Sequence, residues 1–184
     1  STNYYLRALA IAQSEAPSEL PIIYMNLGIN FSKNIKCTEA EKYFNRALQM
    51  QMTNTNPEHY MIATIHLRYG ESFLQCWKNI PKAIDQFHKA LRIARINYGE
   101  KNSTTAMCYH DLGLAYEAMQ DYPEALKFYQ KAIISYSDGF DAEDPDRNPK
   151  IENIRPGLNL IETLKHKGLV LNTIYHSLHR KQDL

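Results

Sequence analysis

The sequence predicts an all-α fold, a right-handed α-solenoid made of stacked helical hairpins. Two observations lead to this class. Within each of several segments, large side chains recur three and four residues apart, which is the period of an α-helix. A pattern of glycine, alanine and aromatic residues also returns three times at a nearly fixed spacing, and such self-similarity is the mark of a repeat architecture.

Each copy of the pattern has a first half centred on glycine and a second half with alanines and an aromatic residue. Gly28, Gly70 and Gly113 follow one another after 42 and 43 residues. The copies agree at seven positions, which are Tyr24, Leu27, Gly28, Phe31, Ala40, Phe44 and Ala47; His66, Tyr69, Gly70, Phe73, Ala83, Phe87 and Ala90; and Tyr109, Leu112, Gly113, Tyr116, Ala125, Tyr129 and Ala132. We expect a helix in each half, with the small residues where the two helices approach to about 8–10 Å.

The second helix of each copy has its own start signal. Thr38-Glu39-Ala40-Glu41 and Asp121-Tyr122-Pro123-Glu124 have the residue order of a capping box. Asn79-Ile80-Pro81 combines an N-cap residue with a proline in the first turn. These signals and the repeat register predict helices at residues 2–15, 18–34, 38–53, 57–77, 80–98, 103–119, 122–137 and 157–180.

We interpret residues 1–184 as a single solenoid. It begins with half of an earlier repeat at 1–16, because Tyr5, Ala8 and Leu9 match second-helix positions of the next copy. Its further parts are repeats at 17–56, 57–101 and 102–137, an acidic loop at 138–156, and the first helix of a truncated fourth repeat at 157–184. Hairpins interrupted at both ends indicate a piece of a longer protein, since each repeat buries its face on its neighbour.

The pattern resembles the tetratricopeptide repeat, W-x2-L-G-x2-Y followed by A-x3-F, over about residues 18–137. It differs in that Tyr24, His66 or Tyr109 stands at the tryptophan position, and in that the closing proline is absent. The longer period is similar to that of kinesin light chains, and Tyr98-Gly99-Glu100 is similar to their linker. The resemblance implies a module that binds other protein segments, needs no cofactor and is not an enzyme.

A second resemblance lies near the C-terminus. An acidic, proline-containing loop, then Asn148-Pro149, then residues 160–168 (LIETLKHKG), is similar to a bacterial architecture in which tetratricopeptide repeats precede a caspase-like CHAT peptidase domain. This resemblance implies a regulatory or recruiting part of such a protein. A free-standing adaptor for cargo or a signalling partner is the alternative, and an enzyme in its own right is the interpretation we favour least.

Composition excludes several other classes. The chain has 21 Lys+Arg against 20 Asp+Glu, so it lacks the basic excess typical of nucleic-acid binders. It has neither an apolar run long enough to span a membrane nor a recognisable signal peptide at its start. Cys37, Cys76 and Cys108 are odd in number and form no C-x2-C pair, which predicts reduced thiols and a cytoplasmic protein.

In the resembled family the first helices of the repeats line a concave surface, which is where we expect a peptide to bind. The predicted peptide-binding residues are Met25, Ile29, Leu67, Glu71, Leu74, Gln75, Met107, His110, Leu114 and Glu117. This surface is apolar with a few polar groups, which suits an extended peptide or a helix, and its glutamates favour a basic residue in the partner. Burial of individual positions between repeats stays an alternative, and so does self-association through the truncated ends.

Three residue groups invite a chemical interpretation. Cys108 and His110 are close in sequence, but side chains two apart on a helix point away from each other. His176 and His179 lie one turn apart and lack a carboxylate to complete a metal site. The acidic run at 138–146 lacks the spacing of an EF-hand loop. We therefore predict neither a catalytic nor a metal site, and a carboxylate clamp is also disfavoured, because Arg68 is the one cation at the clamp positions.

Overall fold

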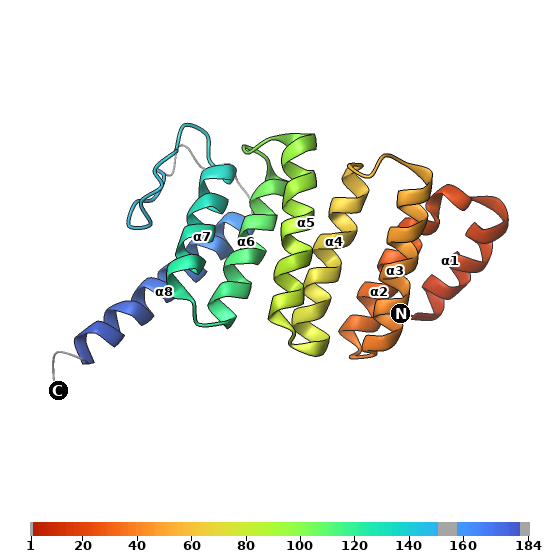
Figure 1. The fold of residues 1–184 in the computed structure, drawn as a ribbon, viewed down its shortest axis with the longest axis horizontal. Coiled ribbons are helices and arrows are strands. Elements are labelled where there is room, and N and C mark those ends of the chain that lie inside the picture. The colour runs from red at the N-terminus through yellow and green to blue at the C-terminus, as the bar shows by residue number, and fades with distance from the viewer. Residues whose placement is uncertain (1, 151–157, 181–184) are drawn as a thin grey trace. The chain divides into compact units, whose positions relative to one another are not determined.

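The computed structural model describes residues 2–150 and 158–180, and in this part of the chain it contains eight α-helices and no β-strand. The prediction of an all-α fold of helical hairpins is confirmed. The chain divides into two compact units, Ser1–Asn97 and Tyr98–Leu184 (Figure 1). Among the described residues no helix is both long and apolar enough to cross a membrane.

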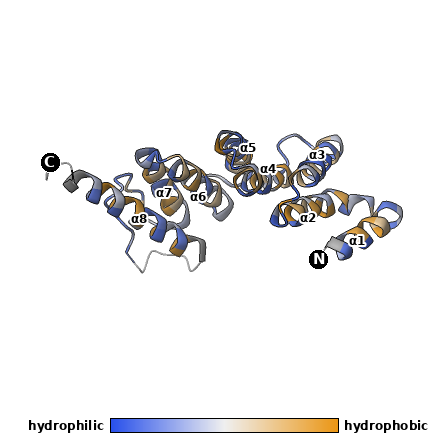
Figure 2. Ribbon diagram, turned by 90° about the horizontal axis from the view of Figure 1, so that it is seen from below, coloured by the Kyte–Doolittle hydropathy of each residue, from blue (hydrophilic) through white to orange (hydrophobic). Residues whose placement is uncertain are grey.

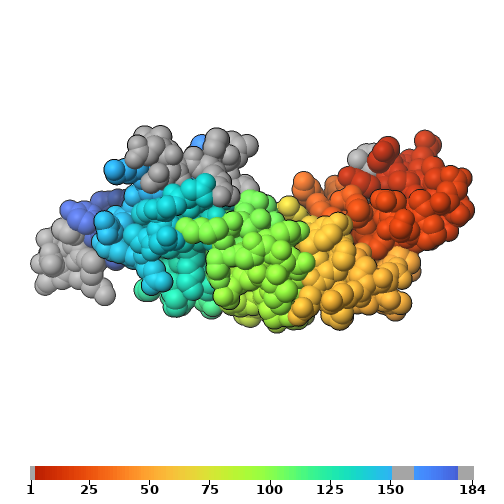
Figure 3. Space-filling model, turned by 90° about the horizontal axis from the view of Figure 1, so that it is seen from above, coloured from red at the N-terminus to blue at the C-terminus, as the bar shows by residue number. Residues whose placement is uncertain are grey.

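The first unit holds one single helix and two hairpins. Its elements are α1 (Thr2–Glu15), the short 3-10 helix η1 (Pro17–Glu19), α2 (Leu20–Lys33), α3 (Cys37–Asn54), α4 (Tyr60–Ser72), the π-helical turn η2 (Phe73–Trp77) and α5 (Ile80–Tyr98). Helix α1 packs on α2, α2 on both α3 and α4, and α3 on α4. Within the unit the chain colours follow one another without mixing, so each element lies beside its neighbours in sequence (Figure 3).

The second unit holds one hairpin, a loop and a long final helix. The hairpin pairs α6 (Ser103–Ala118) with α7 (Tyr122–Tyr136), and α8 (Leu158–Arg180) packs on both of them. Each helix carries hydrophobic and hydrophilic residues together, as Figure 2 shows. The unit has a hydrophobic cluster in which Ala125, Leu126 and Tyr129 of α7 meet Val170 of α8.

The repeat glycines lie where the helices of each hairpin meet. A Cβ atom built on Gly28 would stand 2.9 Å from the ring of Phe44. The same atom on Gly70 would collide with the ring of Phe87, and Gly113 faces Tyr129 in the same way. The glycine of the first helix therefore makes room for the aromatic residue of the second, as the repeat pattern predicts. Gly168 on α8 has no such neighbour within 4 Å.

A ladder of aromatic rings joins the two hairpins of the first unit. Phe44 of α3 stacks on Tyr69 of α4 with ring centroids 4.9 Å apart. Tyr69 stacks on Phe73 at 4.7 Å, and Phe73 packs against Trp77 at 5.0 Å. Because Phe44 and Phe73 are repeat positions, the same residues that define the pattern also hold one repeat on the next.

The predicted helix boundaries are close to the observed ones, with three corrections. Helix α4 begins at Tyr60 rather than at residue 57, because the His59 side chain accepts the backbone N–H of Met61 and caps it. Its last turn widens into a π-helix that ends at Trp77, and the following residue, Lys78, adopts a left-handed conformation. The predicted capping box at Thr38 is wrong, because α3 already begins at Cys37. The predicted N-cap residues Asn79 and Asp121 do accept backbone N–H groups of the first turn.

Candidate functional site

In the first unit the predicted peptide-binding residues divide between core and surface. Met25 is 9% exposed and Leu67 only 3%, so both side chains belong to the core and the prediction is corrected for them. Ile29, Glu71 and Leu74 are half-buried, and Gln75 is exposed. Four of the six predicted residues in this unit therefore reach its surface.

These surface residues come from neighbouring repeats and lie together. Helix α2 packs beside α4 and η2, and Ser32 Oγ donates a hydrogen bond of 3.4 Å to Gln75 Oε1. Burial raises the pKa of Glu71, while the nearby charges of Arg68 and Lys33 oppose this shift. We call the surface formed by Ile29, Lys33, Glu71, Leu74 and Gln75 the α2–α4 face.

Glu71 is not a free anion on this face. Its carboxylate pairs with Arg68, one turn earlier on α4. The expected preference for a basic partner is therefore corrected at Glu71, because its charge is already neutralised within α4. This ion pair also engages Arg68, which is the one cation at the positions of a carboxylate clamp.

In the second unit three of the four predicted residues of α6 lie at the contact with α8. Thr163 Oγ1 lies 2.9 Å from His110 Nδ1, and His166 Nδ1 lies 3.1 Å from Glu117 Oε2. Leu114 packs against the cluster that contains Val170, and Met107 is half-buried. The fourth-repeat helix thus contacts His110 and Glu117 and shares a hydrophobic cluster with Leu114, so the alternative of burial between repeats holds for these three.

The contact between α6 and α8 is rich in titratable groups. Burial lowers the pKa of His110 to about 4, and His166 acts in the same direction, whereas Glu162 and Glu117 oppose the shift. The Tyr129 hydroxyl donates to Glu117, and burial together with this hydrogen bond raises the pKa of the tyrosine. Neutral His110 is therefore the form that this contact holds.

Two of the three cysteines form a disulfide, which corrects the prediction of reduced thiols. Cys37 at the start of α3 is bonded to Cys76 in η2, with Cα atoms 5.5 Å apart. The two are 39 residues apart in sequence, and the packing of one repeat on the next brings them together. Cys76 follows Gln75 directly, so the disulfide lies at the edge of the α2–α4 face.

The other groups with a chemical interpretation are engaged elsewhere. Cys108 is buried, which raises its thiol pKa to about 12, and His110 is bonded to Thr163. His176 is exposed, and the side chain of His179 lies outside the described residues. In the part of the chain that the structure covers, no three His, Cys, Asp or Glu residues are grouped so as to hold a metal ion.

The described part of the acidic loop is held against its unit by two lysines. Lys167 of α8 is 2% exposed, and its ammonium donates to Gln130 Oε1, Arg147 O and Asn148 Oδ1 at 2.7–2.8 Å. Burial lowers the pKa of Lys167 to about 8, against the attraction of Asp146 and Asp144. Lys101 pairs with Asp141 at 2.7 Å and donates to three backbone carbonyls around residues 134–140.

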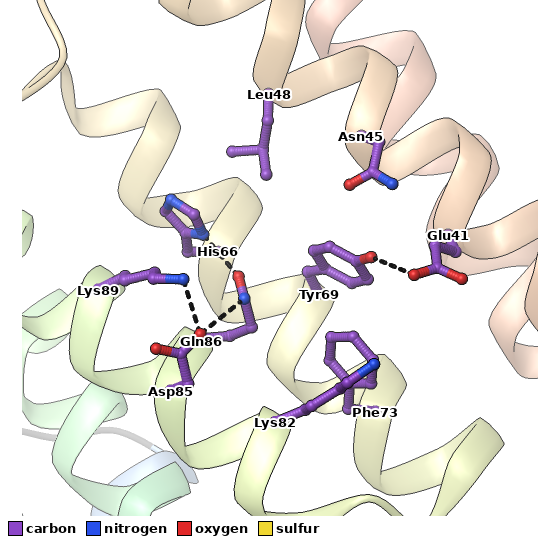
Figure 4. Close-up of a pocket in the computed structure, with 10 residues that line it drawn as sticks. All are labelled: Glu41, Asn45, Leu48, His66, Tyr69, Phe73, Lys82, Asp85, Gln86 and Lys89. Carbon is purple, nitrogen blue, oxygen red and sulfur yellow. Dashed lines mark hydrogen bonds and ion pairs between the residues drawn. The ribbon is translucent and has the colours of Figure 1, made fainter.

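The first unit also contains a pocket of about 400 Å³ on the side of its second helices, which sequence reasoning missed (Figure 4). Its walls come from α3 and α5, and α4 with η2 forms the floor. The lining residues are Glu41, Asn45, Leu48, His66, Tyr69, Phe73, Lys82, Asp85, Gln86 and Lys89. Figure 4 shows the Tyr69 ring between the residues of α3 and those of α5.

Hydrogen bonds and charges organise this pocket. His66 Nδ1 lies 2.7 Å from Gln86 Oε1, and burial lowers the pKa of His66. The neutral imidazole donates from Nδ1 to this carbonyl oxygen, so Nε2 keeps a lone pair that can accept a hydrogen bond. The Tyr69 hydroxyl donates to Glu41 at 3.3 Å, and the ammonium of Lys82 lies 5.5 Å from the centre of the Phe73 ring.

Comparisons with known proteins agree with the repeat. The family model of the tetratricopeptide repeat matches residues 61–136. Protein HGV2 of Halocynthia roretzi is 38% identical over 73 residues, which are 40% of this chain and 14% of that protein. The crystal structure of BtubC (BKLC) from P. vanneervenii shares the fold with a TM-score of 0.73 and 22% identity, over 91% of this chain and 63% of that one.

The class of protein follows from the geometry and these matches together. The chain is similar to tetratricopeptide-repeat domains, and it spans only a small part of the curated relative. At 22% identity the likeness to BtubC shows the fold alone. Folds of this class generally mediate contacts between proteins.

Proposed function

We propose that this chain is a protein-interaction module whose α2–α4 face binds an extended peptide or a helix of a partner. The observation that supports this is the side-by-side packing of first helices from two repeats, which combines half-buried Ile29 and Leu74 with exposed Lys33 and Gln75. Apolar anchors within a polar rim are the usual composition of an interface that binds and releases its partner. In the second unit α8 occupies the corresponding surface of α6, so the proposal is confined to the first unit.

Variants of the two apolar anchors test this site. A peptide is first selected from a displayed random library on the wild-type chain. We expect the double variant Ile29→Asp with Leu74→Asp to lose this peptide, because each carboxylate would have to be buried without a partner. Binding is measured by titration calorimetry, and circular dichroism checks that the helices remain.

A matched control carries the same chemical change elsewhere in the unit. Met52 and Ile96 are 52% and 54% exposed on α3 and α5. The variant Met52→Asp with Ile96→Asp should bind the selected peptide as the wild type does. If the control loses the peptide while the Ile29 and Leu74 variant keeps it, the binding surface lies on the second helices and the proposal is wrong.

A finer version of the proposal is that the chain is the regulatory or recruiting part of a larger protein with a caspase-like CHAT peptidase domain. The contact between Lys167 and Asn148 supports it, because it joins the two halves of the resembled C-terminal segment. A free-standing adaptor is the alternative. The reading frame beyond Leu184 distinguishes them, since an α/β domain with a histidine and a cysteine favours the first version and further repeats favour the second.

A further inference from the structure

The second hairpin departs from its neighbours at three linked positions. In the first hairpin the guanidinium of Arg46 lies 5.9 and 6.0 Å from the ring centres of Tyr24 and Tyr43. In the third, the ammonium of Lys131 lies 5.7 and 5.8 Å from those of Tyr109 and Phe128. A cation over two aromatic rings therefore closes the outer side of both hairpins, an arrangement that stabilises a packed surface.

In the second hairpin both six-membered rings are missing. The repeat register places His66 where Tyr24 and Tyr109 stand, and Gln86 where Tyr43 and Phe128 stand. His66 and Gln86 lie within hydrogen-bond distance of each other, at 2.7 Å, instead of packing as a pair of six-membered rings. An imidazole and an amide, both smaller and more polar, stand in their place, and the pocket of about 400 Å³ lies here.

The cation has also moved to a different partner. Lys89 corresponds to Arg46 and Lys131, but its ammonium pairs with Asp85 at 2.7 Å. The position of Asp85 carries a lysine in the other two hairpins, Lys42 and Lys127, which would repel a cation rather than hold it. The two changes act together. His66 and Gln86 remove the ring pair, and Asp85 holds the Lys89 ammonium against α5 instead of over the rings.

We propose that this pocket binds an aromatic side chain of a partner polypeptide, with a phenol preferred, in the place of the ring pair that the second hairpin lacks. Its volume lies in the range of about 300–1,000 Å³ usual for ligand sites. The buried rings of Tyr69 and Phe73 form the floor, and Lys82 and Lys89 supply cations at the wall. The Glu41 carboxylate supplies an acceptor for a phenol hydroxyl. The site is separate from the α2–α4 face.

A second pocket of the unit lies at the first hairpin and differs in its lining. It measures about 460 Å³ and is lined by Gln13 of α1, by Tyr24 and Arg46, and by later residues of α3. There the ring and its cation are present and form part of the wall. The second hairpin is thus where the ring position itself is open.

The test uses small aromatic probes and variants that restore the ring pair. N-acetyl-tyrosinamide, N-acetyl-phenylalaninamide and N-acetyl-leucinamide are titrated into the whole chain, and backbone amide shifts are followed by NMR. We expect saturable shifts at His66, Gln86 and Lys89 with the tyrosine probe, weaker binding of the phenylalanine probe, and at least about tenfold weaker binding of the leucine probe. The variant His66→Tyr with Gln86→Phe should remove the binding, and so should the milder variant Gln86→Phe.

Three results would overturn the assignment. One is the absence of saturable shifts with the tyrosine probe in the wild type. The second is equal binding of the tyrosine and leucine probes, which would make the pocket merely apolar. The third is undiminished tyrosine-probe binding in a Gln86→Phe variant whose circular dichroism and melting temperature match those of the wild type.

Discussion

At the scale of single residues, the repeat positions act as complementary pairs. Gly28, Gly70 and Gly113 lack a side chain where an aromatic ring of the paired helix lies against them. The glycine and the ring are therefore one structural unit, although they are 16 or 17 residues apart in sequence. The second hairpin keeps this pair and changes another one, the ring pair that Arg46 and Lys131 cover in its neighbours.

The variant Gly70→Leu should destabilise the chain by about 1–3 kcal/mol, the usual effect of overpacking a buried contact. Its side chain would meet the ring of Phe87, which is fully buried and has no room to move aside. Lys127→Ala should be nearly neutral, because the Lys127–Glu124 ion pair is exposed. Urea unfolding measures both, and equal midpoints would contradict the assigned helix contact.

At the scale of elements, α8 decides which surface of the second unit is available. It lies against α6 through His110 and Glu117 and against α7 through the cluster around Val170. Its buried Lys167 also binds the described end of the acidic loop. One helix thus covers three of the four predicted binding residues of α6 and organises the loop before it.

Acid should weaken the contact between α6 and α8. The pKa of His110 is lowered to about 4 in the folded chain. At a pH between this value and the ordinary histidine pKa, the unfolded chain therefore binds more protons than the folded chain. The contribution of His110 to the free energy of unfolding is then fully present above the ordinary histidine pKa and is lost as the pH falls toward about 4. We expect a loss on the order of 1–2 kcal/mol between about pH 7 and about pH 5, measured by urea unfolding.

A variant separates this effect from the titration of other groups. His110→Gln keeps a group that can bond to Thr163 but does not ionise. Its stability should change less than that of the wild type over the same range of pH. An equal change in both proteins would assign the acid sensitivity to other carboxylates or histidines.

At the scale of the whole molecule, the disulfide is the feature that bears on where the protein resides. The expectation of a cytoplasmic protein rests on three reduced thiols, and the pairing of Cys37 with Cys76 removes that ground, since disulfides persist mainly in oxidising compartments. The cytoplasm remains a proposal. Thiol labelling tests it: cells are lysed directly into denaturant with the labelling reagent, and all three cysteines of a cytoplasmic protein should be reduced and react.

Reduction should destabilise the first unit in the purified protein. A bridge that closes a loop of this length stabilises by about 2–4 kcal/mol. We expect a dithiol reductant to lower the melting temperature of the wild type and to leave that of Cys37→Ser unchanged. Three titratable thiols in the denatured but unreduced protein would contradict the pairing.

The sequence by itself determined the helical class, the repeat register and most helix boundaries. These follow from local rules, because helical period, capping residues and the glycine–aromatic pattern can all be seen in one stretch of chain. The helix contact at Gly70 and the N-cap at Asn79, for example, could be predicted without tertiary information. The sequence also contained the signal for the pocket, since His66 and Gln86 stand where other copies have rings, but the meaning of that difference depends on what packs above them.

Only the tertiary structure decided which predicted residues are surface. Met25 and Leu67 occupy the same repeat position, and packing between repeats buries both side chains. His110 is covered by a helix more than fifty residues later, and Cys37 meets Cys76 across a repeat boundary. The physical reason is the same in each case: burial and pairing are set by the element packed against a residue, and the period of its own helix carries no information about that neighbour.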